Sequence, residues 1–231
     1  MLSSPQNCPE SVAIVRERIT RAAEQSGRTV DSVTLIAASK GQTAAAIAAA
    51  AQAGLTNFGE NYLQEALEKI ATLRSLGLTW HFIGRVQANK TRAIAENFAW
   101  VHTVERLKIA ERLAEQRPFH AARLNVCLQL HLGGETTKGG VELAELPALA
   151  AAVGKLPRLH LRGLMCMPPP EHDPEDQRHW FATTKRAFDR LNTAGFALDT
   201  LSMGMSADCD AAIAAGSTMV RIGTAIFGAR T

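Results

Sequence analysis

Two hydrophobic patterns alternate along the chain. Short apolar runs stand between longer stretches in which apolar residues return every three or four positions, as they do on one face of a helix. The runs that predict strands are residues 33–38, 56–58, 80–84, 99–103, 124–132, 160–165, 200–205 and 218–222. Because these runs are largely apolar, they indicate strands buried on both faces, as in a parallel sheet.

Helical patterns precede the first run and follow most of the others. They predict helices over residues 9–26, 43–53, 62–73, 141–153 and 175–193, two more that end near residues 94 and 114, and a short one over 207–215. Gly27 is suited to end the first helix, and the Thr43 hydroxyl is suited to cap the second. The last strand is the one without a convincing helix after it.

Strict alternation of strands and helices predicts a parallel sheet. Eight such units in 231 residues favour a closed (β/α)8 TIM-type barrel, with one extra helix at the N-terminus. No linker or low-complexity tract divides the sequence, so residues 1–231 are expected to form a single domain. A doubly wound open sheet is the alternative.

Composition excludes several classes of protein. With 46% hydrophobic residues and a net charge of +3, the chain has enough apolar material for a core. Basic residues are dispersed and aromatic residues make up only 5%, so no nucleic-acid partner is expected. The longest apolar stretch, residues 44–51, is too short for a membrane span, and no signal peptide is evident. Four widely spaced cysteines give no metal or redox motif, which favours a cytoplasmic protein without a metal site.

Lys40 is the most informative residue for chemistry. It directly follows the first predicted strand, and the active sites of such barrels lie at the C-terminal ends of the strands. A lysine whose pKa is lowered there becomes a nucleophile that condenses with an aldehyde to an imine. On position alone, an ordinary solvated lysine is the simpler interpretation.

A second signal lies on the last two loops. Ser206 follows the seventh strand, and Gly223 and Thr224 follow the eighth, where such barrels commonly bind phosphate. Ordinary turn chemistry is the alternative for each residue alone. Arg221 falls inside the last strand and needs a partner there, such as a ring nitrogen, a phosphate or a carboxylate of an internal ion pair.

Together these residues suggest a ligand with an aldehyde at one end and a phosphate at the other. Pyridoxal 5'-phosphate (PLP) fits this description, and so does the sugar phosphate of a class I Schiff-base aldolase. An arginine that faces a ring nitrogen would keep the pyridine unprotonated and a poor electron sink.

The order of the motifs resembles one known family, the pyridoxal phosphate homeostasis proteins, which are single-domain relatives of the alanine racemase N-terminal barrel. The motifs are AASK at 37–40, NFGENY at 57–62, HFIGRVQANK at 81–90, GGETTKG at 133–139, GLM at 163–165, LSMGMS at 201–206 and VRIGTAIFG at 220–228. One departure stands at residues 41–44, where the family usually has a second lysine and a proline.

The resemblance implies a role for each site residue. Lys40 would carry PLP as an internal aldimine, and Arg221 would face the pyridine nitrogen. The residues implied to hold the phosphate or line the pocket are Ser206, Gly223, Thr224, Asn61 and Met203. Lys138 matches a family lysine near the entrance that is implicated in handling the cofactor.

A carrier is favoured over an enzyme. A racemase needs an acid/base group on each face of the α-carbon, and the second base of alanine racemases is a tyrosine from an additional domain. This sequence ends three residues after Gly228 and has a single tyrosine, Tyr62. We therefore expect a monomer that holds PLP for vitamin B6 and amino-acid homeostasis and passes it transiently to apo-enzymes. A low-activity racemase and the aldolase remain as alternatives.

Overall fold

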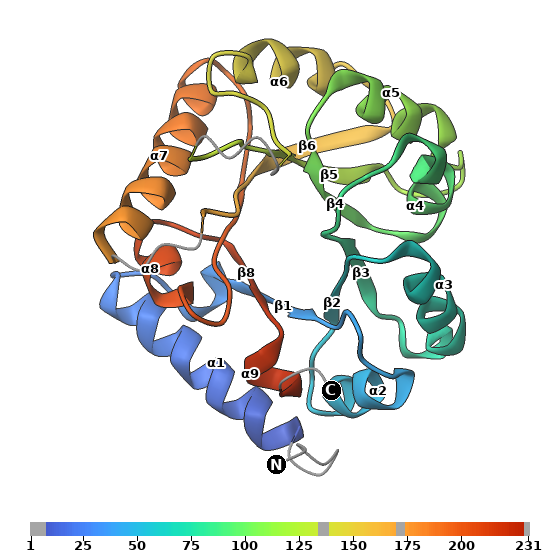
Figure 1. Ribbon diagram of the computed structural model, residues 1–231, viewed down its shortest axis with the longest axis vertical. Coiled ribbons are helices and arrows are strands. Elements are labelled where there is room, and N and C mark those ends of the chain that lie inside the picture. The colour runs from blue at the N-terminus through green and yellow to red at the C-terminus, as the bar shows by residue number, and fades with distance from the viewer. Residues whose placement is uncertain (1–7, 134–138, 170–173, 229–231) are drawn as a thin grey trace.

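Eight parallel strands close into a barrel in chain order, with helices around the outside (Figure 1). The computed structural model describes residues 8–133, 139–169 and 174–228. The strands are β1 (Thr34–Ala38), β2 (Asn57–Glu60), β3 (Thr79–Phe82), β4 (Trp100–Val104), β5 (Leu124–Gln129), β6 (Leu159–Met165), β7 (Thr200–Ser202) and β8 (Met219–Ile222). The barrel closes where β1 pairs with β8, from Thr34 opposite Met219 to Ala37 opposite Ile222. The predicted barrel is confirmed and the open sheet is excluded.

The α-helices are α1 (Cys8–Gln25), α2 (Ala44–Gln52), α3 (Leu63–Thr72), α4 (Thr91–Asn97), α5 (Leu107–Gln116), α6 (Leu146–Gly154), α7 (Pro174–Thr193), α8 (Cys209–Ala214) and α9 (Thr224–Phe227). Short 3₁₀ helices are η2 (Val30–Ser32), η3 (Arg74–Leu76) and η4 (Ala88–Lys90). The Thr43 hydroxyl accepts from the amide of Ala46 at 3.2 Å, so the predicted cap of α2 is confirmed. Within the ranges described, no helix has both the length and the apolar character that crossing a membrane requires.

Strand residues alternate between two apolar regions. The large core cluster lies between the sheet and the helices and includes Val220 and Ile222 of β8. A smaller cluster lies in the barrel interior, and it consists of Ile36, Trp100, Cys127, Met165 and Met219. Arg221 stands between two outward-facing residues of β8, so its side chain enters the barrel.

Several elements differ from the sequence-based expectation. The strand predicted over 124–132 ends at Gln129. The predicted helix at 141–153 begins only at Leu146, because Val141 forms a bridge with Leu130 beside the end of β5. The predicted strand at 200–205 ends at Ser202, since the chain turns at Gly204, whose φ is +97°. A Cβ on Gly204 would lie 2.6 Å from the Cβ of Ala212, so the turn packs tightly on α8. The short helix α9 after β8 was not expected.

Candidate functional site

Helix α3 holds the backbone on both sides of Lys40. Lys40 lies two residues after β1 and is half-buried. Before it, the carbonyl of Ser39 accepts a hydrogen bond from Lys69 Nζ at 2.8 Å. After it, the amide of Gly41 donates to Glu65 Oε1 at 2.7 Å. The two peptide groups that flank the predicted nucleophile are therefore fixed by one helix, which fixes the direction in which the Lys40 side chain leaves the backbone.

A buried ion pair supports this arrangement. Glu60, at the end of β2, is fully buried and accepts from Lys69 Nζ at 2.8 Å and from Ser39 Oγ at 2.6 Å. Burial raises the pKa of the Glu60 carboxyl, and its hydrogen bonds from Lys69 and Ser39 act in the opposite direction. Lys69 also pairs with Glu65, one helical turn earlier. The sequence analysis did not predict this cluster, although oppositely charged residues four positions apart, such as Glu65 and Lys69, commonly pair on a helix.

Arg221 is held by neutral groups. Its Nη1 donates to the carbonyl of Ser202 at 2.6 Å and to Ser202 Oγ at 2.7 Å, and its Nη2 donates to the carbonyl of Cys166 at 2.9 Å. Burial lowers the pKa of the guanidinium, which is 4% exposed. Within the described ranges, no carboxylate forms an ion pair with Arg221. The internal ion pair that the sequence left open is therefore absent there.

Two hydroxyl groups meet where the phosphate site was predicted. Thr224 Oγ1 lies 3.2 Å from Ser206 Oγ, which joins the loops after β8 and β7. Gly223 lies against the end of β1, because a Cβ on it would stand 3.2 Å from the carbonyl oxygen of Ala38. The loop that carries the hydroxyls is therefore adjacent to the strand that leads into Lys40.

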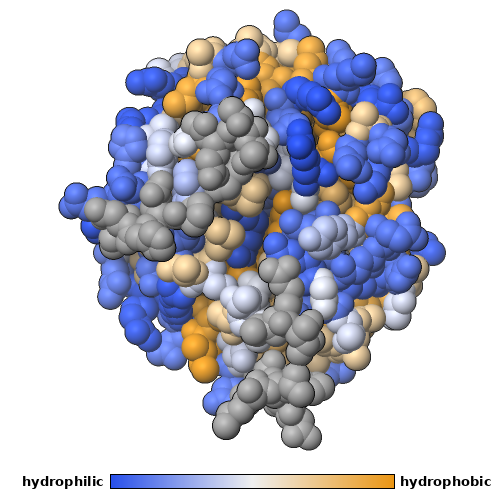
Figure 2. Space-filling model, viewed as in Figure 1, coloured by the Kyte–Doolittle hydropathy of each residue, from blue (hydrophilic) through white to orange (hydrophobic). Residues whose placement is uncertain are grey.

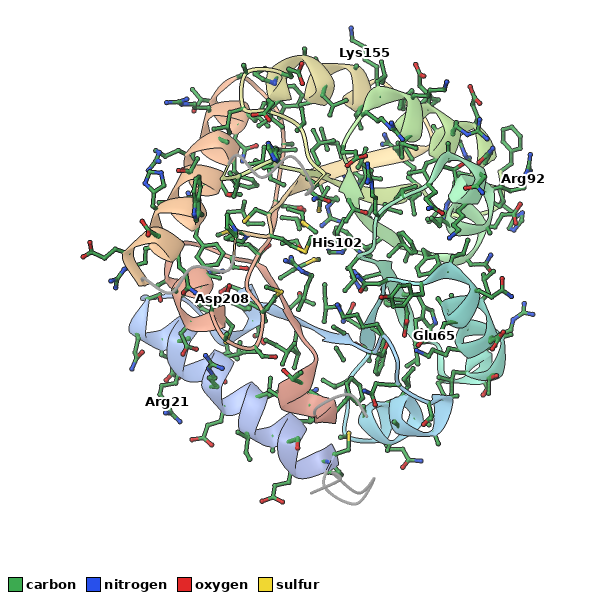
Figure 3. All side chains as sticks on the ribbon, viewed as in Figure 1. Arg21, Glu65, Arg92, His102, Lys155 and Asp208 are labelled. Atoms are coloured by element: carbon green, nitrogen blue, oxygen red, sulfur yellow. The ribbon has the colours of Figure 1, made fainter. Side chains whose placement is uncertain are left out.

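Helix α1 fixes the Ser206 loop from outside. Arg18 Nη1 donates to the carbonyl of Ser206 at 2.6 Å, while its Nε and Nη2 hold Asp210 at 2.9 Å and 3.0 Å. The hydrogen bond with Asp210 raises the pKa of Arg18. From inside the loop, Asp208 Oδ1 accepts from the amide of Met205 at 2.5 Å; Asp208 is labelled beside α8 in Figure 3. The extra N-terminal helix thus has a direct contact with the predicted phosphate loop.

The remaining predicted residues lie in different surroundings. Asn61 directly follows β2, and its Oδ1 is buried without a hydrogen-bond partner in the part of the chain that the structure describes. Met203 is fully buried within the large core cluster. Lys138 lies outside the described residues.

The arrangement fits PLP. Lys40, Asn61, Ser206 and Thr224 follow β1, β2, β7 and β8, which are neighbours around the barrel. One end of these four adjacent strands therefore carries a half-buried lysine, a pair of hydroxyl groups and a buried amide oxygen that has no hydrogen-bond partner among the described residues. The buried cation Arg221 lies inside β8. Figure 2 shows hydrophilic residues at the hollowed centre of the face viewed along the barrel. Such a set suits a flat polar ligand with an anionic tail.

Comparisons with known proteins identify the family. The family model of the alanine racemase N-terminal domain matches residues 14–231. A pyridoxal phosphate homeostasis protein of Pseudomonas aeruginosa is 55% identical over 221 residues, which cover 96% of this chain and 95% of the relative. The chain belongs to the pyridoxal phosphate homeostasis protein family. The family member of Escherichia coli strain K12 is 52% identical over 223 residues, with 95% of each chain covered.

Solved structures agree with this membership of the family. PipY of Synechococcus elongatus without PLP has a TM-score of 0.87 and 36% identity, and the match covers 96% of this chain and 100% of PipY. PipY with PLP bound has a TM-score of 0.81 and 37% identity, with 91% and 99% covered. An alanine racemase of Corynebacterium glutamicum has a TM-score of 0.70 at 17% identity and shares the fold; this chain spans 62% of it. The family resemblance drawn from the motifs is confirmed.

Proposed function

We propose that this protein binds PLP at the ends of β1, β2, β7 and β8 and contributes to vitamin B6 and amino-acid homeostasis. The observation that carries the proposal is the joint placement of Lys40 and the Ser206–Thr224 hydroxyl pair on adjacent strand ends. A solved relative at 37% identity has PLP bound, and curated relatives carry the corresponding name.

Each site residue has a defined role in this proposal. PLP supplies an aldehyde, which forms a C=N bond with the Lys40 amine and releases water. The hydroxyls of Ser206 and Thr224 hold the phosphate, and Gly223 allows the backbone to approach it. Asn61 offers the ligand its Oδ1, which has no hydrogen-bond partner among the described residues. Met203 is fully buried in the large core cluster, just before the loop of Ser206.

Arg221 restrains the chemistry of the site. A guanidinium has donors only and stays protonated, so a ring nitrogen that faces it keeps its lone pair and carries no proton. An unprotonated pyridine withdraws electrons weakly, which disfavours carbanion chemistry on bound amino acids. Tyr62 is the single tyrosine of the chain, and it is 60% exposed. A carrier is therefore favoured over a racemase.

We infer a cytoplasmic, single-domain monomer that hands PLP to apo-enzymes by transient contact. The four cysteines support a reducing compartment, since all are free and buried. Size-exclusion chromatography with light scattering should give the mass of one chain, and a dimer mass would contradict the monomer.

Titration with PLP tests the binding proposal. Cofactor-free protein should gain a visible absorbance band that saturates at one PLP per chain, and Lys40→Ala should abolish this band. Lys90→Ala is the matched control, because Lys90 is exposed in η4. An unchanged band in Lys40→Ala would contradict the assignment.

Two further assays separate the alternatives. Incubation of the PLP-loaded protein with single-enantiomer amino acids should give no racemisation above that of free PLP, and a clear excess would favour the racemase. Borohydride reduction of cofactor-free protein in the presence of sugar phosphates should give no adduct, whereas an adduct on Lys40 would favour the aldolase.

A further inference from the structure

Two histidines are buried inside the barrel and have no part in the proposed function so far. His81 of β3 and His102 of β4 are both fully buried. Figure 3 shows His102 near the middle of the barrel. His102 Nδ1 lies 2.7 Å from Ser202 Oγ, and His102 Nε2 lies 2.9 Å from His81 Nδ1. With Arg221 on Ser202, the side chains form a continuous row across the interior.

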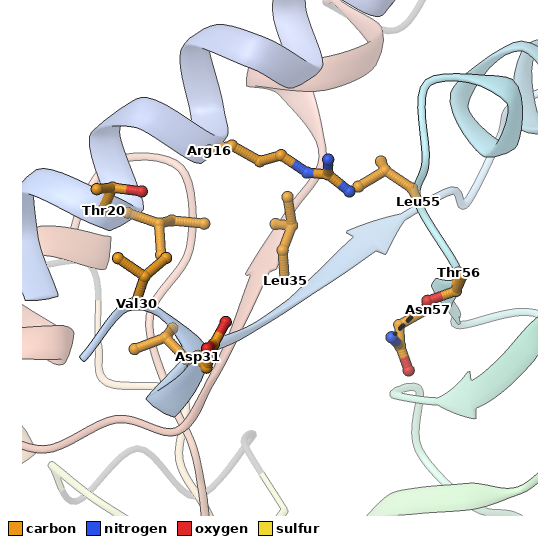
Figure 4. A pocket seen from close by; sticks show the side chains of 10 residues that line it. Arg16, Thr20, Val30, Asp31, Leu35, Leu55, Thr56 and Asn57 are labelled. Carbon is orange, nitrogen blue, oxygen red and sulfur yellow. Dashed lines mark hydrogen bonds between the residues drawn. The ribbon is translucent and has the colours of Figure 1, made fainter.

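The row has a second end at Asn57. His81 Nε2 lies 2.9 Å from Asn57 Oδ1, and Asn57 Nδ2 donates to Thr56 Oγ1 at 3.1 Å. Figure 4 shows Asn57 and Thr56 among the residues that line a pocket beside the beginnings of β1 and β2. The row therefore runs from Arg221, the residue assigned to the cofactor ring, to Asn57, the first residue of β2.

The two ends of the row, Arg221 and Asn57, agree on one direction for its hydrogen bonds. A guanidinium can only donate, so Ser202 Oγ accepts from it and has its own proton left to give. That proton goes to His102 Nδ1 when this nitrogen is unprotonated, and the other end of the row requires this, because Asn57 Oδ1 can only accept. A neutral His102 carries its proton on Nε2 and donates to His81 Nδ1. By the same rule His81 carries its proton on Nε2 and donates to Asn57 Oδ1.

Charge and packing agree with neutral rings. Burial, and the positive charge of nearby Arg221, keep the pKa of His102 well below its usual value, and burial lowers the pKa of His81 to about 3. Trp100 stacks on His81 with ring centroids 5.6 Å apart and an angle of 15° between the planes. The rings are thus held without charge and with little freedom to turn.

We propose that His102 and His81 are positioning residues for Arg221. Both carry their proton on Nε2, and the one-way row Arg221–Ser202–His102–His81–Asn57 holds the Ser202 oxygen where it accepts from the guanidinium. This fixes the guanidinium in the orientation in which it meets the cofactor ring. The inference rests on the proposed function for its purpose, but the row itself exists without the cofactor.

Nuclear magnetic resonance of the cofactor-free protein tests the row directly. Long-range ¹⁵N–¹H spectra distinguish the two neutral imidazole forms and the doubly protonated form. Of the seven histidines, the two signals of interest are assigned with His81→Gln and His102→Gln. Both should be neutral with the proton on Nε2 near neutral pH. A proton on Nδ1 of either ring would overturn the proposal, whatever the protein binds.

Substitutions at His102 test the consequence for Arg221. His102→Phe replaces the imidazole by an apolar ring that offers Ser202 no acceptor, so the dissociation constant for PLP should rise about tenfold. His102→Asn places an amide oxygen near the former Nδ1 and should restore most of the affinity. Cys127→Ala is the matched control, because it trims the same interior cluster outside the row.

Four outcomes decide the matter. Rescue by His102→Asn, together with an affinity close to that of the wild type in Cys127→Ala, supports a positioning role. Wild-type affinity in His102→Phe, or equal losses in His102→Phe and His102→Asn, would overturn it. If wild-type protein binds no PLP while the expected imidazole forms are observed, the proposed function fails and the row stands.

Discussion

Arg221 and Lys69 are both buried cations, but the groups they contact differ in charge. Lys69 lies against two carboxylates, whereas Arg221 meets two carbonyls and a hydroxyl. An uncompensated buried charge is costly, so the surroundings of Arg221 favour a ligand that brings a lone pair or a negative charge. This is the residue-level reason for assigning it to the pyridine nitrogen.

The effect of Arg221 on chemistry can be measured by reversing its charge. Arg221→Glu should let the ring nitrogen take up a proton, which makes the pyridine a stronger electron sink. Bound PLP should then react faster with added L-amino acids, as followed by the loss of its visible band. Arg221→Lys, which keeps the charge, is the control, and circular dichroism checks that both variants fold. Equal reaction rates in the two variants would count against the assignment.

At the level of elements, α3 contributes most to the surroundings of Lys40. Its Lys69 is 5% exposed and binds both Glu60 and the carbonyl of Ser39. Lys69→Met should leave Glu60 buried without a counter-ion and cost about 3–5 kcal/mol of the free energy of unfolding in urea. Adding Glu60→Leu should recover a large part of this loss. Additive effects of the two substitutions would show that the pair is not coupled.

Arg18 of helix α1 should act on the phosphate end of the site rather than on stability. The Arg18–Asp210 pair is substantially exposed, with side chains 37% and 56% accessible, so Arg18→Ala should cost less than about 1 kcal/mol of stability. Because Arg18 also holds the carbonyl of Ser206, PLP affinity should fall roughly threefold to tenfold.

Pyridoxal, which lacks the phosphate, provides the control for this variant. Its affinity should be the same in Arg18→Ala and in the wild type. A parallel loss for both ligands would mean that α1 acts on the whole barrel and not on the phosphate loop.

Some features of the fold could be predicted from the sequence and others could not. The strands were predictable because both faces of each strand are buried, which leaves continuous apolar runs such as the one before Lys40. The ends of β1, β7 and β8 could be picked out from the sequence as a candidate site because polar and glycine residues follow those runs. Glu65 and Lys69 were not, since an oppositely charged pair one turn apart is equally typical of a solvated helix face.

The row through the barrel was beyond the reach of sequence reasoning. His102 and Ser202 are 100 positions apart, and their contact depends on the register of strands on opposite sides of the interior. A single histidine within an apolar run carries no periodic signal. Val141 shows the same limit on a smaller scale, because its bridge to Leu130 interrupts a stretch that has the pattern of a helix.

At the scale of the whole molecule, the two buried histidines should make the folded state less stable in acid. In the unfolded chain their pKa is near the usual 6.5, while burial lowers the pKa of His81 to about 3 and keeps that of His102 well below normal. Between these values the unfolded state binds more protons than the folded state. The free energy of unfolding should therefore fall as the pH drops below about 6.5, by about 1.4 kcal/mol per pH unit for each histidine.

Urea unfolding at about pH 7 and about pH 5 measures this dependence. The double variant His81→Phe/His102→Phe lacks the two imidazoles and should lose less stability between the two conditions than the wild type does. The comparison removes the contribution of the carboxylates, which both proteins share. An equal loss in both proteins would mean that the two imidazoles do not resist protonation in the folded barrel.

The most direct test of the whole account is reduction of the PLP-loaded protein with borohydride, followed by peptide mass spectrometry. Reduction makes the link between amine and cofactor permanent, so the modified residue can be read from the fragment masses. The account predicts one pyridoxyl phosphate group per chain, on Lys40, and none in Lys40→Ala. A group found on another lysine, or an unmodified Lys40 in protein that retains PLP, would contradict it.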